Sequence, residues 1–489
     1  MQTIILSIII FLPLMAGIAI LCMPAGRRNW IRNTALTAAG LTFVLTLVAY
    51  LSYNVAQGGY QFEDSAEWLP ALGISYHVGV NGISLPLVLL AGVVVLTGVL
   101  VSWNVSDRPR EFFAYLMFLA ASVLGVFCSL DLFMLFFFFE LAVFPKYLMI
   151  VMWGSPKTRN YGGMKLTLYL FIGSVIALVG VLAIYFQAGL NSFDMLAIER
   201  AGLLTDFQLI WFPVVFLGFA ILGGIFPFHS WAPDGHVAAP TAVSMLLAGV
   251  EMKVGAFAAL RVAIQLMPGG AQAWAPLILI LGTVNVVYGA FIAMIQTDFK
   301  YVIGFSSVSH MGLVLIGFAT LTPQGLLGAG MQMFSHGIMT ALFFSVVGMV
   351  YDRTHTREIS KLGGLYKKMP WAMVGFIVAG LVSMGMPGFS GFVAEFPIFM
   401  GAWQVAPLVA IIAALGIVIT AAYILLVVRR VFFGELSAEF EHHVKDITWR
   451  DKLAIGLLCA LMIGLGVFPS LMVPMVQAGL GDMTFLGGM

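Results

Sequence analysis

The chain has 489 residues, of which 61% are hydrophobic and only 9% are charged. Soluble domains carry roughly 25% charged residues, and a water-soluble protein of this length has no means of hiding so much apolar surface. The composition therefore predicts an all-α polytopic protein of the lipid bilayer. The net charge of +1 argues against a nucleic-acid partner.

The three cysteines, Cys22, Cys128 and Cys459, lie in separate apolar runs. They form no C-x-x-C pair and no metal-ligand spacing, so neither an iron–sulfur cluster nor a zinc site is predicted. The sequence also has no haem, flavin or nucleotide motif. We therefore expect no cofactor in this chain.

Hydropathy predicts fourteen membrane spans. The first apolar run is long enough to cross a bilayer, so we interpret it as a helix rather than a cleavable signal. The expected spans are 3–23, 33–54, 83–104, 112–130, 132–152, 165–187, 209–227, 241–266, 272–296, 301–320, 325–351, 370–402, 406–432 and 453–476.

The distribution of positive charge supports this count. Of the 23 lysines and arginines, 19 fall in or beside the loops that follow odd-numbered spans. The other four are Arg200, Arg261, Lys146 and Lys253. Because cytoplasmic loops are enriched in lysine and arginine, we expect the odd loops in the cytoplasm and both termini in the periplasm of a bacterial inner membrane.

Two spans are predicted to be broken helices. The seventh runs into a segment with Pro227, Pro233 and Pro240, and the twelfth contains Pro387 and Gly388. Proline and glycine interrupt the helical hydrogen-bond ladder. The breaks lie five spans apart, and such an offset reverses the membrane orientation, so spans 4–8 and 9–13 are predicted inverted repeats.

This pattern divides the chain into segments. We expect N-terminal helices at 1–109 and a core at 110–432 made of repeats at 110–266 and 272–432. A loop and the last span would occupy 433–489. Spans 1–3 and 14 are expected to be peripheral additions.

Ionisable residues inside apolar segments are the strongest functional signal. A charge at the centre of a bilayer costs roughly 2.5–3.5 kcal/mol even on insertion scales, so such residues usually have a function. Carboxylates, lysines and histidines spread through one multi-span protein indicate a proton path. The candidates are Glu140, Lys146, Glu251, Lys253, His310, His336 and Glu395.

Several motifs resemble one known family. The segment FPFHSWAPDGHVAAPT at 226–241 is similar to the signature of the antiporter-like membrane subunits of respiratory complex I. Further similar motifs are QTDFK at 296–300, the SSVSHMG run at 306–312, His336-Gly337 with YDRTHTR at 351–357, and FVAEF at 392–396. The resemblance covers residues 110–430. A glutamate at position 395, where the L branch has lysine, indicates the M branch, equivalent to mitochondrial subunit 4.

The resemblance implies fourteen helices with inverted repeats and a proton-translocating role. The family's fifth-span glutamate falls on Glu140, its eighth-span lysine on Lys253 and its twelfth-span glutamate on Glu395; the histidines of spans ten and eleven fall on His310 and His336. The chain would couple NADH oxidation and quinone reduction elsewhere in the complex to proton transfer. The resemblance also implies other complex I membrane subunits as partners, especially the neighbouring L and N subunits. NADH, FMN, iron–sulfur clusters and quinone would then be bound by other chains of the complex.

One position departs from the family pattern. The family has a seventh-span lysine that pairs with the fifth-span glutamate, and here that position is Leu222. Lys146 and Glu251 are charged where the family is usually apolar. Pro145 should distort the turn between Glu140 and Lys146, so we hypothesise that Lys146 replaces the missing lysine as counter-charge of Glu140. Glu251 and Lys253 are two residues apart and point to opposite helix faces, so we expect them not to pair.

Other interpretations stay open. The buried charges are also compatible with structural ion pairs, and the two histidines with hydrogen-bonded core residues. An Mrp-type cation/proton antiporter subunit has the same fold. A bis-histidine haem protein needs two histidine pairs, whereas only one is available here, and a passive scaffold has no need of buried charge.

Overall fold

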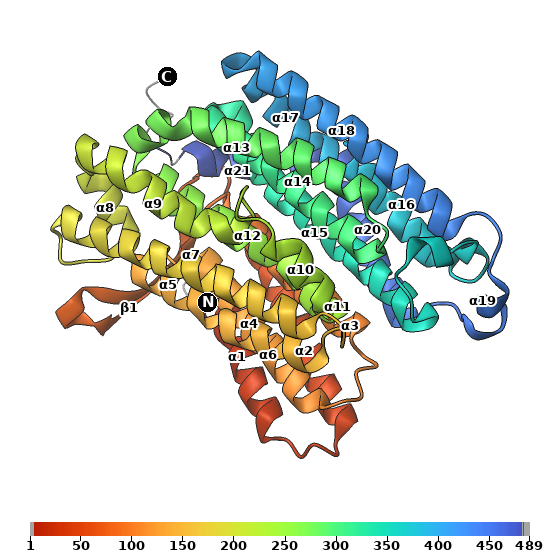
Figure 1. Ribbon diagram of the computed structural model, residues 1–489. Helices are drawn as coiled ribbons and strands as arrows, with labels where there is room; N and C mark the ends of the chain where they lie inside the picture. The colour runs from red at the N-terminus through yellow and green to blue at the C-terminus, as the bar shows by residue number, and fades with distance from the viewer. Residues whose placement is uncertain (1–3, 482, 484–489) are drawn as a thin grey trace.

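The fold is a helical membrane bundle. The computed structural model in Figure 1 describes residues 4–481 and 483, so the last predicted segment is described only in part. Twelve of the described helices are long and apolar enough to cross a membrane. They are α1 (Ile5–Cys22), α2 (Arg28–Ser52), α3 (Ser84–Val101), α4 (Pro109–Cys128), the kinked α5–α6 (Leu132–Leu141 and Val143–Trp153), α7 (Arg159–Ala188), α9 (Thr205–Gly223), span eight (Thr241–Ile264), α13 (Pro268–Ile295), α14 (Phe299–Thr320), α15 (Pro323–Thr354) and α18 with its π-helical end (Pro407–Phe432).

The other two predicted spans have different forms. One consists of α16 (Pro370–Ser383) and α17 (Ser390–Val405), which are separated by a break. The other is α20 (Trp449–Val467), whose first turn carries three charged residues; it ends before Pro469, earlier than expected. The count of fourteen therefore stays a prediction. Short helices complete the described chain: α8 (Met195–Ala201), α10 (Trp231–Ala238), α19 (Ala438–His443) and α21 (Val473–Gly481).

Polar residues fix where several helices begin. Asp131 caps α5, Asp298 caps α14 and Thr322 caps α15, each by accepting backbone N–H groups of the first turn. Thr448 and Asp451 form a reciprocal capping box at α20. Such caps accept hydrogen bonds from the backbone N–H groups that a helix N-terminus leaves free. An N–H group without an acceptor is costly near lipid, where water cannot replace the cap.

Both predicted breaks are confirmed. The seventh span ends at Gly223, and a turn at 224–230 leads into the short helix α10. Asn285 of α13 bridges this turn: its amide oxygen accepts from Phe226 N at 2.6 Å, and its amide nitrogen donates to Gly224 O at 2.8 Å. Backbone groups exposed at membrane depth are thus satisfied by a side chain from the second repeat. The other break, at 384–389, separates α16 from α17.

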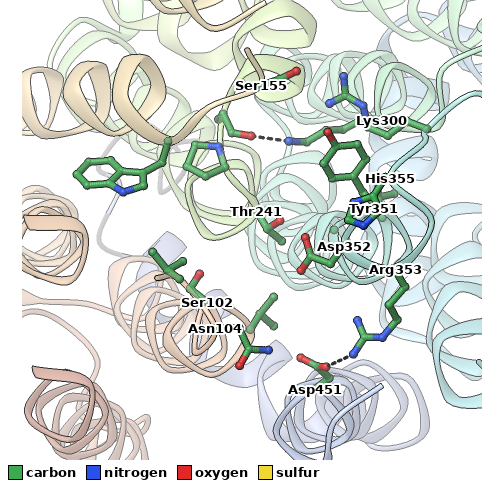
Figure 2. Close-up of a pocket in the computed structure, with 18 of the residues that line it drawn as sticks. Ser102, Asn104, Ser155, Thr241, Lys300, Tyr351, Asp352, Arg353, His355 and Asp451 are labelled. Atoms are coloured by element: carbon green, nitrogen blue, oxygen red, sulfur yellow. Dashed lines mark hydrogen bonds and ion pairs between the residues drawn. The ribbon is translucent and has the colours of Figure 1, made fainter. Parts of the chain in front are cut away.

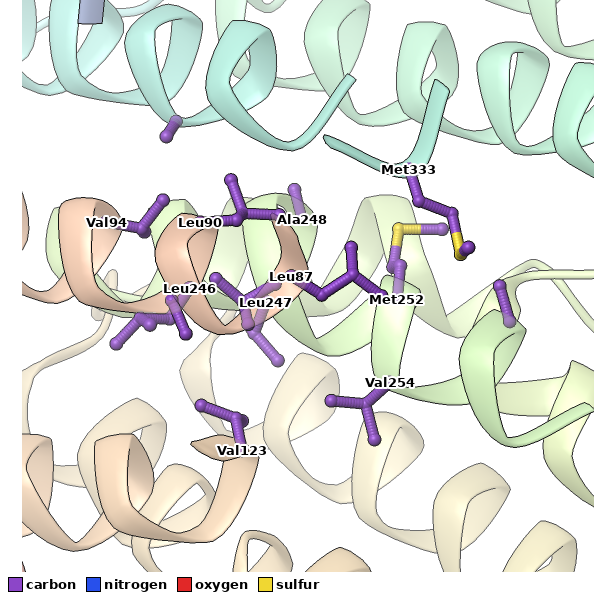
Figure 3. Packing of buried hydrophobic residues seen from close by; sticks show 14 of the residues in the cluster. Leu87, Leu90, Val94, Val123, Leu246, Leu247, Ala248, Met252, Val254 and Met333 are labelled. Atoms are coloured by element: carbon purple, nitrogen blue, oxygen red, sulfur yellow. The ribbon is translucent and has the colours of Figure 1, made fainter. Parts of the chain in front are cut away.

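The helix α3 is not peripheral as expected, because it is buried along almost its whole length. It packs against α2, α4, α11 (Thr241–Leu246) and α15. Figure 3 shows this packing, with Leu87, Leu90 and Val94 of α3 beside Leu246 and Leu247 of span eight. An all-apolar helix without a polar stripe is the type that a bundle can surround on every side.

The loop between the second and third spans contains a β-hairpin that was not predicted. Strands β1 (Gln61–Leu69) and β2 (Ile74–Val80) pair antiparallel. Gly73 at the turn has φ +69°, and a Cβ there would lie 1.9 Å from the Asn191 carbonyl oxygen, so this position needs glycine. In Figure 1 the hairpin and α8 lie at one end of the bundle, and α19 lies at the other.

Candidate functional site

The fifth span is kinked between two of its charged residues. It consists of α5 and α6, which meet at Ala142. Pro145 has no N–H to donate to the carbonyl of Leu141, and this accounts for the interruption. Glu140 lies on the first half and Lys146 on the second, as the sequence predicted.

The partner of Lys146 is Glu251 and not Glu140. The Lys146 ammonium donates to Glu251 Oε2, and both side chains are only 1% exposed. Lys146 therefore forms its direct ion pair with Glu251, while it also interacts electrostatically with Glu140. Glu251 lies on span eight, which packs close enough to α6 to supply a fully buried carboxylate. Burial of a charged pair requires this kind of direct contact, because an isolated buried charge is far more costly.

Span eight contains two π-helical turns that flank Lys253. The span runs through α11, η2 (Leu247–Glu251), α12 (Met252–Ala258) and η3 (Ala259–Ile264), of which η2 and η3 are π-helical. Lys253 is fully buried and donates to the carbonyl oxygen of Ala248, within the first π turn. It forms no ion pair within the described residues. Local π turns occur frequently at functional sites.

His310 and His336 are stacked. Their ring centroids lie 5.3 Å apart with an interplanar angle of 9°, and both side chains are buried. His310 Nδ1 is 2.8 Å from Ser306 O, and its Nε2 is 3.1 Å from Ser383 O, the last carbonyl of α16. His336 Nε2 is 3.2 Å from Ser307 Oγ. The pair thus connects α14 and α15 to the break in the twelfth span.

Glu395 lies next to that break. It is 2% exposed; its Oε1 accepts from Gln332 at 3.2 Å and lies 3.7 Å from His310 Nε2. Its Oε2 has no protein partner. Gly385, with φ +63°, approaches so closely that a Cβ would lie 2.7 Å from this oxygen. The break therefore exposes backbone directly to the carboxylate.

Glu140 is not part of the Lys146–Glu251 ion pair, but Lys146 and Ser174 interact with its carboxylate. Its Oε1 is buried and without a hydrogen-bond partner. The residue lines a largely apolar cavity of about 550 Å³ between α1, α4, α5 and α6, with Leu14, Tyr115 and Phe144 among its walls. Phe144 is 65% exposed, so this cavity lies at the side of the bundle.

Two further buried groups extend the set. His236 is fully buried, and both of its ring nitrogens lack a partner. Lys300 is 5% exposed and donates to Ala239 O at 2.6 Å. Both residues lie in motifs that the sequence matched, at 226–241 and 296–300, but neither was among the candidates.

Lys300 opens onto a polar cavity of about 710 Å³. Figure 2 shows Lys300 with its hydrogen bond to a neighbouring carbonyl, and Tyr351, Asp352 and His355 in the same wall. Arg353, on the same helix as Tyr351 and Asp352, forms an ion pair with Asp451 at 3.0 Å in the lower part of this view. A cavity with so many polar groups is roomy and polar enough to hold water.

These groups form a line across both repeats. Lys146 binds Glu251, which is two residues from Lys253; Lys253 interacts electrostatically with His236, His310 and His336; and His310 approaches Glu395. No three metal-ligating side chains cluster anywhere in the described residues. Histidine, lysine and carboxylate side chains accept and release protons, so the arrangement fits proton transfer.

Fold and site together define a polytopic membrane protein with a buried file of proton-exchanging groups. The family described as NADH:quinone oxidoreductase/Mrp antiporter, TM, matches residues 129–420, and the chain belongs to it. A curated relative, NADH-quinone oxidoreductase subunit M of Rhodobacter capsulatus, is 39% identical, and the match covers 96% of this chain and 94% of the relative.

Two solved structures have the same fold. A chain of respiratory complex I from Thermus thermophilus with bound NADH superposes with a TM-score of 0.90 at 29% identity, covering 99% of this chain and 100% of that one. A chain of the Mrp complex from Dietzia sp. DQ12-45-1b has a TM-score of 0.86 at 19% identity, covering 99% and 97%. The second likeness concerns the fold alone.

Proposed function

We propose that this chain is the proton-translocating M-type membrane subunit of an NADH:quinone oxidoreductase. One observation carries the proposal: buried ionisable groups follow one another from Lys146 to Glu395 across both repeats. Charges placed this way are costly and have few structural uses. The likeness to the Rhodobacter capsulatus subunit, at 39% identity over nearly the whole chain, supports the same role.

The proposed carriers are Glu140, Lys146, Glu251, Lys253, His310, His336 and Glu395. Lys253 is the central carrier, since its ammonium is bound only by a carbonyl among the described residues. The Lys146–Glu251 pair is its neighbour on one side, and the stacked histidines follow on the other. Opening an ion pair beside a buried lysine changes the lysine's proton affinity, which couples conformation to proton transfer.

The polar cavity of Figure 2 is the proposed proton intake. Lys300 lines this cavity, and His236, whose ring nitrogens have no partner among the described residues, interacts electrostatically with both Lys300 and Lys253. Water bound at His236 would complete the hydrogen bonds that its ring lacks. Glu395, next to the break at Gly385, is the proposed group for release or hand-over.

The proposed partners are further membrane subunits, with L- and N-type subunits as neighbours. The Glu140 carboxylate, whose Oε1 has no hydrogen-bond partner, lies in its lateral cavity and is suited to contact with such a neighbour. The bias of lysine and arginine toward odd loops supports a bacterial inner-membrane location with both termini periplasmic. We also propose that the chain binds no cofactor, and that its segments are 1–109, repeats 110–266 and 272–432, and 433–489.

The identity of co-purifying chains tests the proposal. The full-length chain, tagged and extracted in a mild detergent, should co-purify with the redox subunits of an NADH:quinone oxidoreductase. The preparation should acidify the lumen of inside-out proteoliposomes on addition of NADH and quinone. Co-purification with a cation antiporter assembly that lacks NADH oxidation would contradict it.

An Mrp-type antiporter subunit is the second candidate. The Mrp likeness supports it only at the level of fold, at 19% identity. Sodium-dependent proton exchange without NADH would be the corresponding signature. The higher identity to subunit M favours the first candidate.

A further inference from the structure

Three arginines at one end of the bundle form a cluster without an acidic partner. Arg28 and Arg32 are four residues apart at the start of α2, so they lie on the same helix face. Arg450 is the second residue of α20. Both helices pack against α3, and electrostatic repulsion from Arg28 and Arg450 acts on Arg32.

Contacts near the end of α3 bring these arginines together. Arg32 Nη2 donates to Val105 O at 3.0 Å, whereas its Nε is buried without a hydrogen-bond partner. The guanidinium carbon of Arg450 lies 4.2 Å from the ring centroid of Trp103 and 4.9 Å from that of Trp449. Residues 103 and 105 immediately follow α3, so Arg32 and Arg450 converge on one short stretch of chain.

Some basic residues of the odd loops have a counter-charge, whereas the clustered arginines have none within the described residues. Six of those residues pair with carboxylates: Arg110, Lys165, Arg353, Arg357, Lys361 and Lys452. Within the described residues, none of the three clustered arginines forms an ion pair. Like charges held close together are unfavourable unless an anion joins them.

The surroundings indicate what the anion is. Trp30 and Trp449 are each 63% exposed beside the arginines, and tryptophan prefers the level of lipid headgroups. The face of α2 that continues from Arg28 and Arg32 is buried through Ala35, Ala39 and Thr42, whereas Leu41, Val44 and Val48 are exposed on its opposite face. An anionic phosphate is suited to the guanidinium forks, and the two tryptophans are suited to the headgroup level that carries it.

We propose that Arg28, Arg32 and Arg450 bind the phosphate of an anionic phospholipid. The lipid would bridge α2 and α20 over the end of α3, the buried helix beside span eight. This proposal concerns a binding site and does not depend on the transported ion. It places a lipid where two peripheral helices meet the core.

Lipid retention tests the site. The full-length chain, purified with its accompanying subunits, is placed in nanodiscs of dioleoylphosphatidylcholine with limiting dioleoylphosphatidylglycerol, and bound lipid is counted by native mass spectrometry. Arg28→Gln removes no hydrogen bond seen in the structure, and it should weaken retention of the anionic lipid about fivefold, as expected for one interfacial arginine. The triple variant Arg28→Gln/Arg32→Gln/Arg450→Gln should lose the retained lipid.

The matched control is Arg429→Gln/Arg430→Gln, which removes two exposed arginines without a third guanidinium or flanking tryptophans. It should retain the lipid within about twofold of the unaltered protein, because it leaves the cluster's electrostatic contribution intact. Equal retention by Arg28→Gln, by the triple variant and by the control would overturn the proposal. Saturable binding of inorganic phosphate to the unaltered protein, with no preference for phosphatidylglycerol over phosphatidylcholine, would also overturn it.

Discussion

The ion pair of Lys146 and Glu251 lies at the centre of the first repeat. Both side chains are removed from solvent, and the pair joins α6 to span eight beside Lys253. Taking two charges out of water costs several kcal/mol per ion, so stability alone is a poor reason for such a pair. Because Glu251 is two residues from Lys253, the proposed function has the opening of this pair change the proton affinity of Lys253.

A double-mutant cycle tests this pairing. Lys146→Met should destabilise the protein by about 3–5 kcal/mol, because it leaves the Glu251 carboxylate buried without a partner. Lys146→Met/Glu251→Gln should recover most of that stability while proton transfer stays impaired. Thermal unfolding and abundance in membranes report stability, and Lys157→Met, at an exposed position, is the control. Additive losses in the double variant would show that the two residues are not coupled.

The sequence identified Lys146 and Glu251 as unusual charges but did not predict that they form an ion pair with each other. Reasoning along one helix connects Glu140 to Lys146, since both lie on the fifth span. The actual partner comes from span eight, 105 residues away in sequence. Which spans are neighbours depends on the packing of the whole bundle, and no local pattern carries that information.

At the scale of elements, the two broken helices were predictable and the π turns were not. Proline and glycine mark a break directly, because they remove donors and permit unusual backbone angles. The π turns around Lys253 have no residue signature of this kind. The hairpin β1–β2 was also missed, although it supplies Ser75, whose N–H binds Asp131 at the start of α5 at 3.1 Å.

Asn285 should determine how rigidly the backbone of the first break, at 224–230, is held. Asn285→Ala removes both hydrogen bonds to this turn and a third to Val308 O, a loss of about 1–3 kcal/mol locally, so amide exchange at 224–230 should rise on the order of tenfold to a hundredfold. Thr283→Ala, which removes only a hydrogen bond within α13, is the matched control. Unchanged exchange in Asn285→Ala would mean that other contacts hold this segment.

The hairpin should show a pH dependence of its own. The hydrogen bond that His77 Nδ1 donates to Asp194 Oδ2, at 2.7 Å, raises the pKa of His77 above its ordinary value despite burial. Partial burial alone would raise the pKa of Asp194, but the bond to His77 outweighs it and the pKa of that carboxyl is lowered. The His77–Asp194 pair therefore contributes its full stabilisation to the hairpin below about pH 6.5, down to the acid range where Asp194 becomes protonated. This stabilisation is lost as the pH rises through the raised pKa of His77.

Hydrogen-exchange protection factors of β1 and β2 between pH 5 and 9 measure this effect. Protection should fall as pH rises through the pKa of His77, and His77→Gln should flatten the profile. Glu63 lies 3.4 Å from the other ring nitrogen and contributes in the same direction. Protection in the unaltered protein that is independent of pH would contradict the assignment.

At the scale of the whole molecule, composition and motifs were sufficient for the membrane fold and the family. The position of α3 was not predictable, because an apolar helix looks the same whether lipid or protein surrounds it. In the sequence, the row of buried ionisable groups could be recognised only as separate residues. Its continuity, from Lys146 through Lys253 and the stacked histidines to Glu395, depends on contacts between spans that are distant in the chain.

The most direct test of the central claim is proton translocation by a Lys253→Met variant of the assembled complex in proteoliposomes. Proton translocation driven by NADH and quinone should fall by about tenfold or more, since the central carrier is gone, whereas NADH oxidation by an artificial electron acceptor should be unchanged. Lys367→Met, at an exposed position, should pump normally. A normal proton-to-electron ratio in assembled Lys253→Met complex would contradict the account.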